Sequence, residues 1–177
     1  MKTLLSVLLI SISFLVKAQT VYNVYGTTFG IRDISPSVVV TKNSNNGFNV
    51  YNASYGIKDV CPSQVITPNN YGGFDSYKTN FGIPEVFPSQ ISTNSYGNIN
   101  VYETTYGIRD ICPTQIIEPN YNNGYNVYNT TYGIPDITPV QIFQPNSYGG
   151  IDIYNTTNGI RNIYPSVTIS TPTYGGW

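Results

Sequence analysis

Past residue 18, short runs of apolar and aromatic residues alternate with turn-forming residues at a fixed period. Each period contains an aromatic-Gly-Ile step, in which Asn158 is the one replacement of the aromatic residue. A tyrosine stands five residues before each glycine, Ile or Val stands four residues after it, and proline stands six residues after it. Such a period is typical of repeat architectures. The glycines, spaced by 26, 26, 25, 26 and 26 residues, are Gly30, Gly56, Gly82, Gly107, Gly133 and Gly159.

This period divides the chain into six units that together form one predicted repeat domain over residues 19–177. Within the fifth unit, residues 125–132 are rich in β-branched and aromatic residues, which predicts a strand. Gly and Pro then predict a bend at 133–139, a second short strand at 140–144 and a turn at 145–150. No segment shows a helical period, so the predicted class is all-β with about two strands per unit. The units are residues 22–47, 48–73, 74–98, 99–124, 125–150 and 151–176, and Trp177 begins a truncated seventh.

A unit of this size buries too little apolar surface to fold alone, so the units must pack against one another. We expect them to stack as a β-solenoid or an array of hairpins, because a stack requires only that neighbours be alike. The alternative is a closed barrel or ring of β-hairpins, which would use the same number of strands.

The two cysteines, Cys61 and Cys112, occupy the same position in units two and four. In a stack, residues two units apart are separated by about 10 Å, because neighbouring strands lie about 4.8 Å apart. A disulfide requires a Cα separation below about 7 Å. The stacked arrangement therefore predicts that these cysteines are not bonded to each other.

An acidic residue stands three residues after the glycine in five of the six units. Like charges on adjacent strands would repel one another. We expect these residues to lie in the bend and to bond local backbone N–H groups, as in Asx turns. Calcium binding between units is the alternative, although the dense Asp/Gly pattern of calcium-binding repeats is absent. The residues are Asp33, Asp59, Glu85, Asp110 and Asp136.

Residues 1–18 have the features of a secretory signal peptide. Lys2 precedes an apolar run over residues 4–16, and Val16 and Ala18 match a small-residue cleavage site. The apolar run is short for a transmembrane helix, and no later stretch approaches the length required. We therefore expect an exported protein, secreted or held in the cell envelope in the periplasm or at the surface, without a transmembrane segment after cleavage.

Composition argues against several classes of function. Only 10% of the residues are charged and there is no histidine, which removes the commonest general base. Residues 19–177 carry 6 basic and 9 acidic residues, a net charge of −3, without the basic cluster that nucleic-acid binding requires. The acidic residues recur once per unit, as structural positions do, and no unit carries a distinctive charged insertion. We predict a protein that is not an enzyme, needs no cofactor and binds no nucleic acid.

The remaining candidates are surfaces rich in Tyr, Asn and Thr. The tyrosine five residues before the glycine and the aromatic residue one before it lie four apart along a strand, hence on one face. They would form either aromatic ladders between units or a row of platforms for sugar rings. We therefore expect an exported structural or adhesive protein that associates with itself, with a multivalent carbohydrate-binding module as the alternative. The platform residues would be Tyr51, Tyr55, Tyr102, Tyr106, Tyr128 and Tyr132.

Overall fold

A computed structural model describes residues 21–147 and 149–171, and every regular element in these ranges is a β-strand. This confirms the all-β prediction. The proposed signal peptide and Trp177 lie outside the described residues. No helix within the described ranges is long and apolar enough to cross a membrane.

The described chain contains two kinds of strand, and each two-residue strand lies between two longer ones. The long strands are β1 (Val21–Thr28), β3 (Val38–Lys42), β4 (Phe48–Ser54), β6 (Gln64–Pro68), β7 (Phe74–Asn80), β9 (Gln90–Ser95), β10 (Asn98–Thr105), β12 (Gln115–Pro119), β13 (Tyr125–Thr131), β15 (Gln141–Pro145), β16 (Ile151–Thr157) and β18 (Val167–Ser170). The two-residue strands are β2 (Ile31–Arg32), β5 (Ile57–Lys58), β8 (Ile83–Pro84), β11 (Ile108–Arg109), β14 (Ile134–Pro135) and β17 (Ile160–Arg161).

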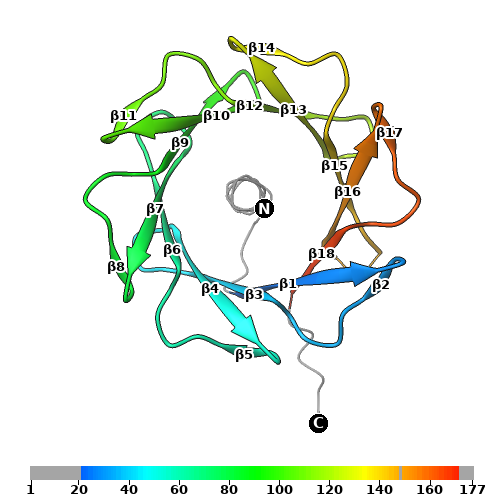
Figure 1. Ribbon diagram of the computed structural model, residues 1–177, viewed down its shortest axis with the longest axis horizontal. Coiled ribbons are helices and arrows are strands. Elements are labelled where there is room, and N and C mark those ends of the chain that lie inside the picture. The colour runs from blue at the N-terminus through cyan, green and yellow to red at the C-terminus, as the bar shows by residue number, and fades with distance from the viewer. Residues whose placement is uncertain (1–20, 148, 172–177) are drawn as a thin grey trace.

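The long strands form a closed barrel. Each pairs antiparallel with the long strands before and after it in sequence, and β1 also pairs with β18, where Asn23 lies opposite Ser170. Figure 1 shows this ring viewed along its axis, with the short strands outside it. The expectation of a solenoid or open hairpin array is therefore wrong, and the closed barrel, our alternative, is correct.

A closed ring also meets the requirement from which we predicted a stack, namely that neighbouring units be alike. An open array of antiparallel strands leaves two edges with unpaired N–H and C=O groups, and closing the sheet removes both edges. In a ring every unit has two neighbours, so six similar units can make the same contacts without a first or last member. Similarity between neighbours is thus as compatible with a closed ring as with a stack.

One face of the barrel wall is apolar and buried. Val50, Ile66 and Val127 are fully buried, and they belong to a single cluster with residues from strands all around the ring. Residues that alternate with them, such as Asn49 and Tyr51, are partly exposed. Because successive side chains of a strand point to opposite faces, the apolar set lines the inside of the barrel and the polar and aromatic set covers its outer face.

At one end of the barrel, each short strand folds back on a long strand through a two-residue turn. In the β4–β5 hairpin, Ser54 lies opposite Ile57, and Tyr55 and Gly56 between them both have positive φ, 53° and 81°. Two consecutive positive φ values define a type I′ turn, the tight turn that matches strand twist. The predicted strand that ran through the aromatic residue is therefore one residue too long, because that residue is the first of the turn. We call the six hairpin tips and the bends that follow them the hairpin rim.

At the opposite end, which we call the turn rim, an asparagine organises most connections between long strands. Asn69 Oδ1 accepts hydrogen bonds from the N–H groups of Tyr71 and Gly73, 3.0 Å each. A Cβ atom on Gly73 would lie only 2.1 Å from the carbonyl oxygen of Ser92, so only glycine fits there. The β9–β10 connection instead uses a two-residue turn, Tyr96-Gly97. This shorter turn accounts for the 25-residue spacing between Gly82 and Gly107.

Neighbouring units are fastened to each other at the hairpin rim. The Thr130 hydroxyl donates to the carbonyl of Pro113 in the preceding unit, and the Thr130 N–H donates to the carbonyl of Thr114 at 3.1 Å. Tyr164 packs over Gly30 in the same way that Phe87 packs over Gly107. The contact between Tyr164 and Gly30 joins the last unit to the first, so side-chain packing closes the ring as well as strand pairing.

Candidate functional site

The hairpin rim exposes large apolar side chains in three positions of nearly every unit. These are the aromatic residue before the glycine, the isoleucine after it, and the Ile or Val four residues after it. Each is at least 71% exposed. Exposed apolar surface gathered in one region marks an interaction site. The residues are Phe29, Tyr55, Phe81, Tyr106, Tyr132, Ile31, Ile57, Ile83, Ile108, Ile134, Ile160, Ile34, Val60, Val86, Ile111, Ile137 and Ile163.

The aromatic residues at the hairpin tips adopt an unfavourable backbone conformation. Tyr55, Tyr106 and Tyr132 have φ values of 53°, 50° and 52°, a region in which side chains other than those of Gly, Asn and Asp are disfavoured. Asn158, at the tip of the last hairpin, has the same conformation with a φ of 51°. The turn therefore does not require an aromatic ring. The exposed rings also gain no burial that would offset the cost of the positive φ.

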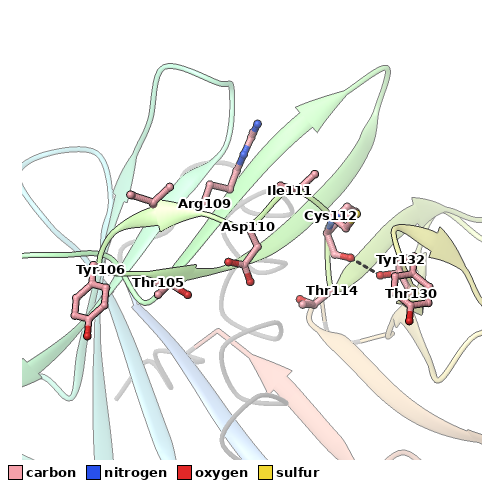
Figure 2. Close-up of a pocket in the computed structure, with 11 residues that line it drawn as sticks. Thr105, Tyr106, Arg109, Asp110, Ile111, Cys112, Thr114, Thr130 and Tyr132 are labelled. Atoms are coloured by element: carbon pink, nitrogen blue, oxygen red, sulfur yellow. Dashed lines mark hydrogen bonds between the residues drawn. The ribbon is translucent and has the colours of Figure 1, made fainter.

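A groove lies between the β10–β11 hairpin and the next hairpin along the rim, with a volume of about 680 Å³. Figure 2 shows Tyr106 at one side of this groove and Tyr132 at the other, with the Asp110 carboxylate between them. Ile108 and Ile111 also line it. The groove thus combines two aromatic rings, two aliphatic side chains and one carboxylate.

A similar groove of about 610 Å³ accompanies the β16–β17 hairpin. Its lining includes Asn158, Ile160 and Ile163, the counterparts of Tyr106, Ile108 and Ile111, and Tyr164 in place of Cys112. The same registers therefore form grooves at two separate places on the rim.

The two sets of predicted platform tyrosines lie in different environments. Tyr55, Tyr106 and Tyr132 are the exposed hairpin tips, whereas Tyr51 and Tyr102 lie on the outer wall beneath cations of their own hairpins. The Lys58 Nζ atom is 3.8 Å from the centroid of the Tyr51 ring, and the Arg109 Cζ atom is 4.5 Å from that of Tyr102.

Tyr25 and Tyr154 are covered likewise by Arg32 and Arg161. Tyr128 is not covered in this way, because Pro135 stands where those hairpins carry a cation. Its hydroxyl accepts a hydrogen bond from Asn126 Nδ2 at 3.3 Å. The expectation that both tyrosines of a unit share one strand face is wrong, since the chain reverses at the tip residue.

The acidic residues lie in the exposed bend after each short strand. The Asp59 N–H donates to the carbonyl of Asn52 at 2.9 Å, and the equivalent bond is made at Asp110 and Asp136. These bonds close the hairpin through the backbone, and the carboxylates remain exposed. Among the described residues, no three Cys, Asp or Glu side chains approach closely enough to hold a metal ion. The acidic residues lie in the bend, as we expected, and each carboxylate belongs to a different hairpin.

Both cysteines are unbonded and exposed. Cys61 packs against Gly82 and Cys112 against Gly133, each at the junction with the following hairpin. The two cysteines are apart because they lie at different junctions of the ring. The prediction that they are unbonded was therefore correct, but the stack from which we derived it was not.

The exposed isoleucines and valines of the rim were not identified as surface residues from the sequence. One signal was available, since an aromatic-Gly pair flanked by short β-rich segments can form a two-residue hairpin, which exposes the residues on both sides of the turn. Comparisons of this chain with models of protein families, with curated proteins and with solved structures found no match.

Proposed function

We propose that this chain is an exported adhesive or structural protein that attaches to its partner through the hairpin rim. The observation that carries the proposal is the ring of apolar side chains, each at least 71% exposed, at equivalent places of successive hairpins. A protein interface buries such residues at its centre, where aromatic side chains contribute most. The proposed partner is a protein surface that offers repeated apolar contacts, which includes a second copy of this chain.

Equivalent weak sites on one rigid ring favour a partner with a repeated structure. When one hairpin is bound, its neighbours are held close to further sites, so binding of the second hairpin becomes intramolecular. Overall affinity can then exceed that of one hairpin by a factor of about 10² to 10⁴. This gain suits attachment to a matrix or a cell surface, where partner molecules are densely arrayed.

The second candidate function is carbohydrate binding, which the groove in Figure 2 favours specifically. Two tyrosine rings border a hollow that also contains a carboxylate and the hydroxyls of Thr105 and Thr114. Aromatic faces and nearby oxygen atoms suit the apolar and polar sides of a sugar ring. The same residues therefore support both candidate functions, which differ in the chemistry of the partner.

The test replaces Tyr55, Tyr106 and Tyr132 by asparagine, the residue that the Asn158 tip already carries. The triple variant and the unchanged protein are compared for retention on protein-coated and on polysaccharide-coated surfaces, and for self-association by sedimentation. Tyr96→Asn is the matched control, because Tyr96 has a φ of 53° and is fully exposed but lies on the turn rim.

We expect the triple variant to lose retention on protein-coated surfaces or to lose self-association at least tenfold, while the control retains both. Retention on polysaccharide alone, lost in the triple variant, would replace the adhesive proposal by the carbohydrate-binding one. Equal retention of all three proteins on every surface would contradict both candidates.

A further inference from the structure

The third unit, residues 74–98, interrupts the apolar lining of the barrel. At the register of Val50 and Val127 this unit has Ser76, and at the register of Ile66 and Phe143 it has Ser92. All of these side chains are buried, Ser76 to 1% exposure and Ser92 completely. The inner wall therefore contains one polar sector, on β7 and β9, within a cluster that is otherwise aliphatic and aromatic.

The same unit also alters the barrel mouth at the hairpin rim. At two other places on this mouth, a glutamine donates to an asparagine on the next strand: Gln115 Nε2 bonds Asn129 Oδ1 at 2.9 Å, and Gln141 Nε2 bonds Asn155 Oδ1 at 3.1 Å. In the third unit and its neighbour the asparagine is replaced by a charged residue. Lys78 lies opposite Gln64, and Glu103 lies opposite Gln90.

Buried polar atoms without partners gather in this part of the barrel wall and mouth. Gln90 is only 6% exposed, and its Oε1 atom has no hydrogen-bond partner; the same is true of Gln64 Oε1 and of Ser76 Oγ. Gln115 Oε1 is also unpartnered, but the Gln115 amide nitrogen is bonded to Asn129. A buried polar atom without a partner lowers stability, and its presence in a native structure calls for an explanation such as a bound ligand.

A hollow of about 650 Å³ opens at this part of the mouth. Gln64, Lys78, Gln90 and Glu103 all line it, together with Glu85 and the ring of Tyr106. Within the described residues, neither the Lys78 ammonium nor either carboxylate forms an ion pair or a hydrogen bond. Lys78 and Glu103 lie on β7 and β10 with β9 between them, and Lys78 is two residues beyond Ser76, which shares a row with Gln90 and Glu103. Two strand spacings across and two residues along the strands separate their backbones by about 12 Å.

We propose that this hollow binds a small zwitterion, of the size of a free amino acid or a dipeptide. The Lys78 ammonium would bind the carboxylate of the ligand, and the Glu103 carboxylate its ammonium group. The unpartnered carbonyl oxygens of Gln64 and Gln90 accept further N–H groups, which a protonated amine supplies. Glu85, with Glu103, gives the hollow a net negative charge, so the ammonium end contributes the stronger attraction.

This site borders the proposed attachment surface at Tyr106 but differs from that surface in chemistry. The hollow volume lies in the range of small-molecule sites, which contain a few placed polar groups. Among the glutamines of the mouth, Gln115 and Gln141 face an asparagine, whereas Gln64 and Gln90 face the charged Lys78 and Glu103. A bound zwitterion satisfies both charges and the buried amide oxygens at once.

The test uses isothermal titration calorimetry of the full chain with individual amino acids and diglycine. Acetate and ethylamine, each carrying one of the two charges, and the neutral sugars glucose and N-acetylglucosamine complete the panel. The diagnostic variants are Lys78→Asn and Glu103→Asn, which install the asparagine of the neighbouring pairs. The matched control is Asn129→Ala, at the same register on another part of the mouth.

We expect at least one zwitterion to bind, with its dissociation constant raised tenfold or more in each diagnostic variant and unchanged in Asn129→Ala. Both diagnostic variants should melt at or above the temperature of the unchanged protein, because each gains a glutamine–asparagine bond. This result separates loss of a ligand contact from loss of folding. Binding of neutral sugars alone, binding that survives both substitutions, or no signal from any zwitterion would each overturn the proposal.

Discussion

Replacing the aromatic hairpin tips by asparagine should make the protein more stable, although it removes large apolar residues. Tyr55, Tyr106 and Tyr132 are 96%, 85% and 91% exposed, so their rings contribute almost no burial. Their positive φ values place them in a conformation that costs an ordinary residue about 1–2 kcal/mol and that asparagine adopts more readily.

The expected gain follows from that difference in backbone preference. If asparagine recovers about half of the cost, each substitution stabilises the folded state by about 0.5–1 kcal/mol, and the triple variant by about 1.5–3 kcal/mol. For a domain of this size, 1 kcal/mol corresponds to about 2–4 °C in melting temperature. The triple variant should therefore melt roughly 3–12 °C higher.

The assay is equilibrium unfolding in urea, with thermal melting followed by circular dichroism. Tyr55→Ala is the control, because alanine removes the ring but does not favour the left-handed conformation, and it should give no such gain. If the triple variant proved less stable than the unchanged protein by 1 kcal/mol or more, the tip rings would be making stabilising contacts. The argument that they are retained for binding would then fail.

Three further substitutions test individual contacts of the fold. Thr130→Ala removes the hydroxyl that bonds the Pro113 carbonyl and should cost about 0.5–1.5 kcal/mol in urea unfolding, whereas the exposed Thr131→Ala should cost almost nothing. Lys58→Met removes the cation over the Tyr51 ring and should cost about 0.5–1 kcal/mol, while Lys42→Met, whose ammonium makes no cation–ring contact within the described residues, should be neutral; equal effects would exclude a specific cation–ring contact. Burial, and then the charge of Asp75, raise the pKa of Tyr77 above its ordinary value near 10, so the folded state keeps a neutral phenol where the unfolded chain ionises. Stability should fall as the pH rises above about 10 towards the folded pKa, and Tyr77→Phe should reduce that fall; unfolding curves between pH 8 and 11 that were parallel for the two proteins would contradict this.

The sequence allowed the class and about two strands per unit to be predicted, because alternation and turn residues are local signals. It missed the two-residue strands, such as β14, which lies inside the bend predicted at 133–139. It did not distinguish a stack from a ring. Both arrangements place similar units side by side, and the contact that separates them, β1 with β18, joins residues about 140 positions apart. No local pattern records such a contact.

The candidate surface was predicted only in part. The tip tyrosines were identified, but their partners on the same strand lie beneath Lys58 and Arg109, because a two-residue turn folds the short strand back over the wall. The mouth hollow was missed for a different reason. Its distinctive residues, Lys78 and Glu103, are substitutions within the period and not insertions, so they become visible only when each register is compared across all units.

Ring closure is the central claim, since the grooves between hairpins and the mouth hollow both depend on it. The direct measurement is a disulfide between Asn23→Cys and Ser170→Cys, which lie opposite each other on β1 and β18, in a chain with Cys61→Ser and Cys112→Ser. A closed barrel brings the two Cα atoms to about 4.5–5.5 Å, within the range a disulfide allows. Mild oxidation should then give a folded monomer lighter by two hydrogens, while Asn23→Cys with Asn100→Cys, on β10 across the ring, stays reduced. A folded Asn23→Cys and Ser170→Cys protein that stayed reduced, or that linked only between molecules, would show that the first and last strands do not meet.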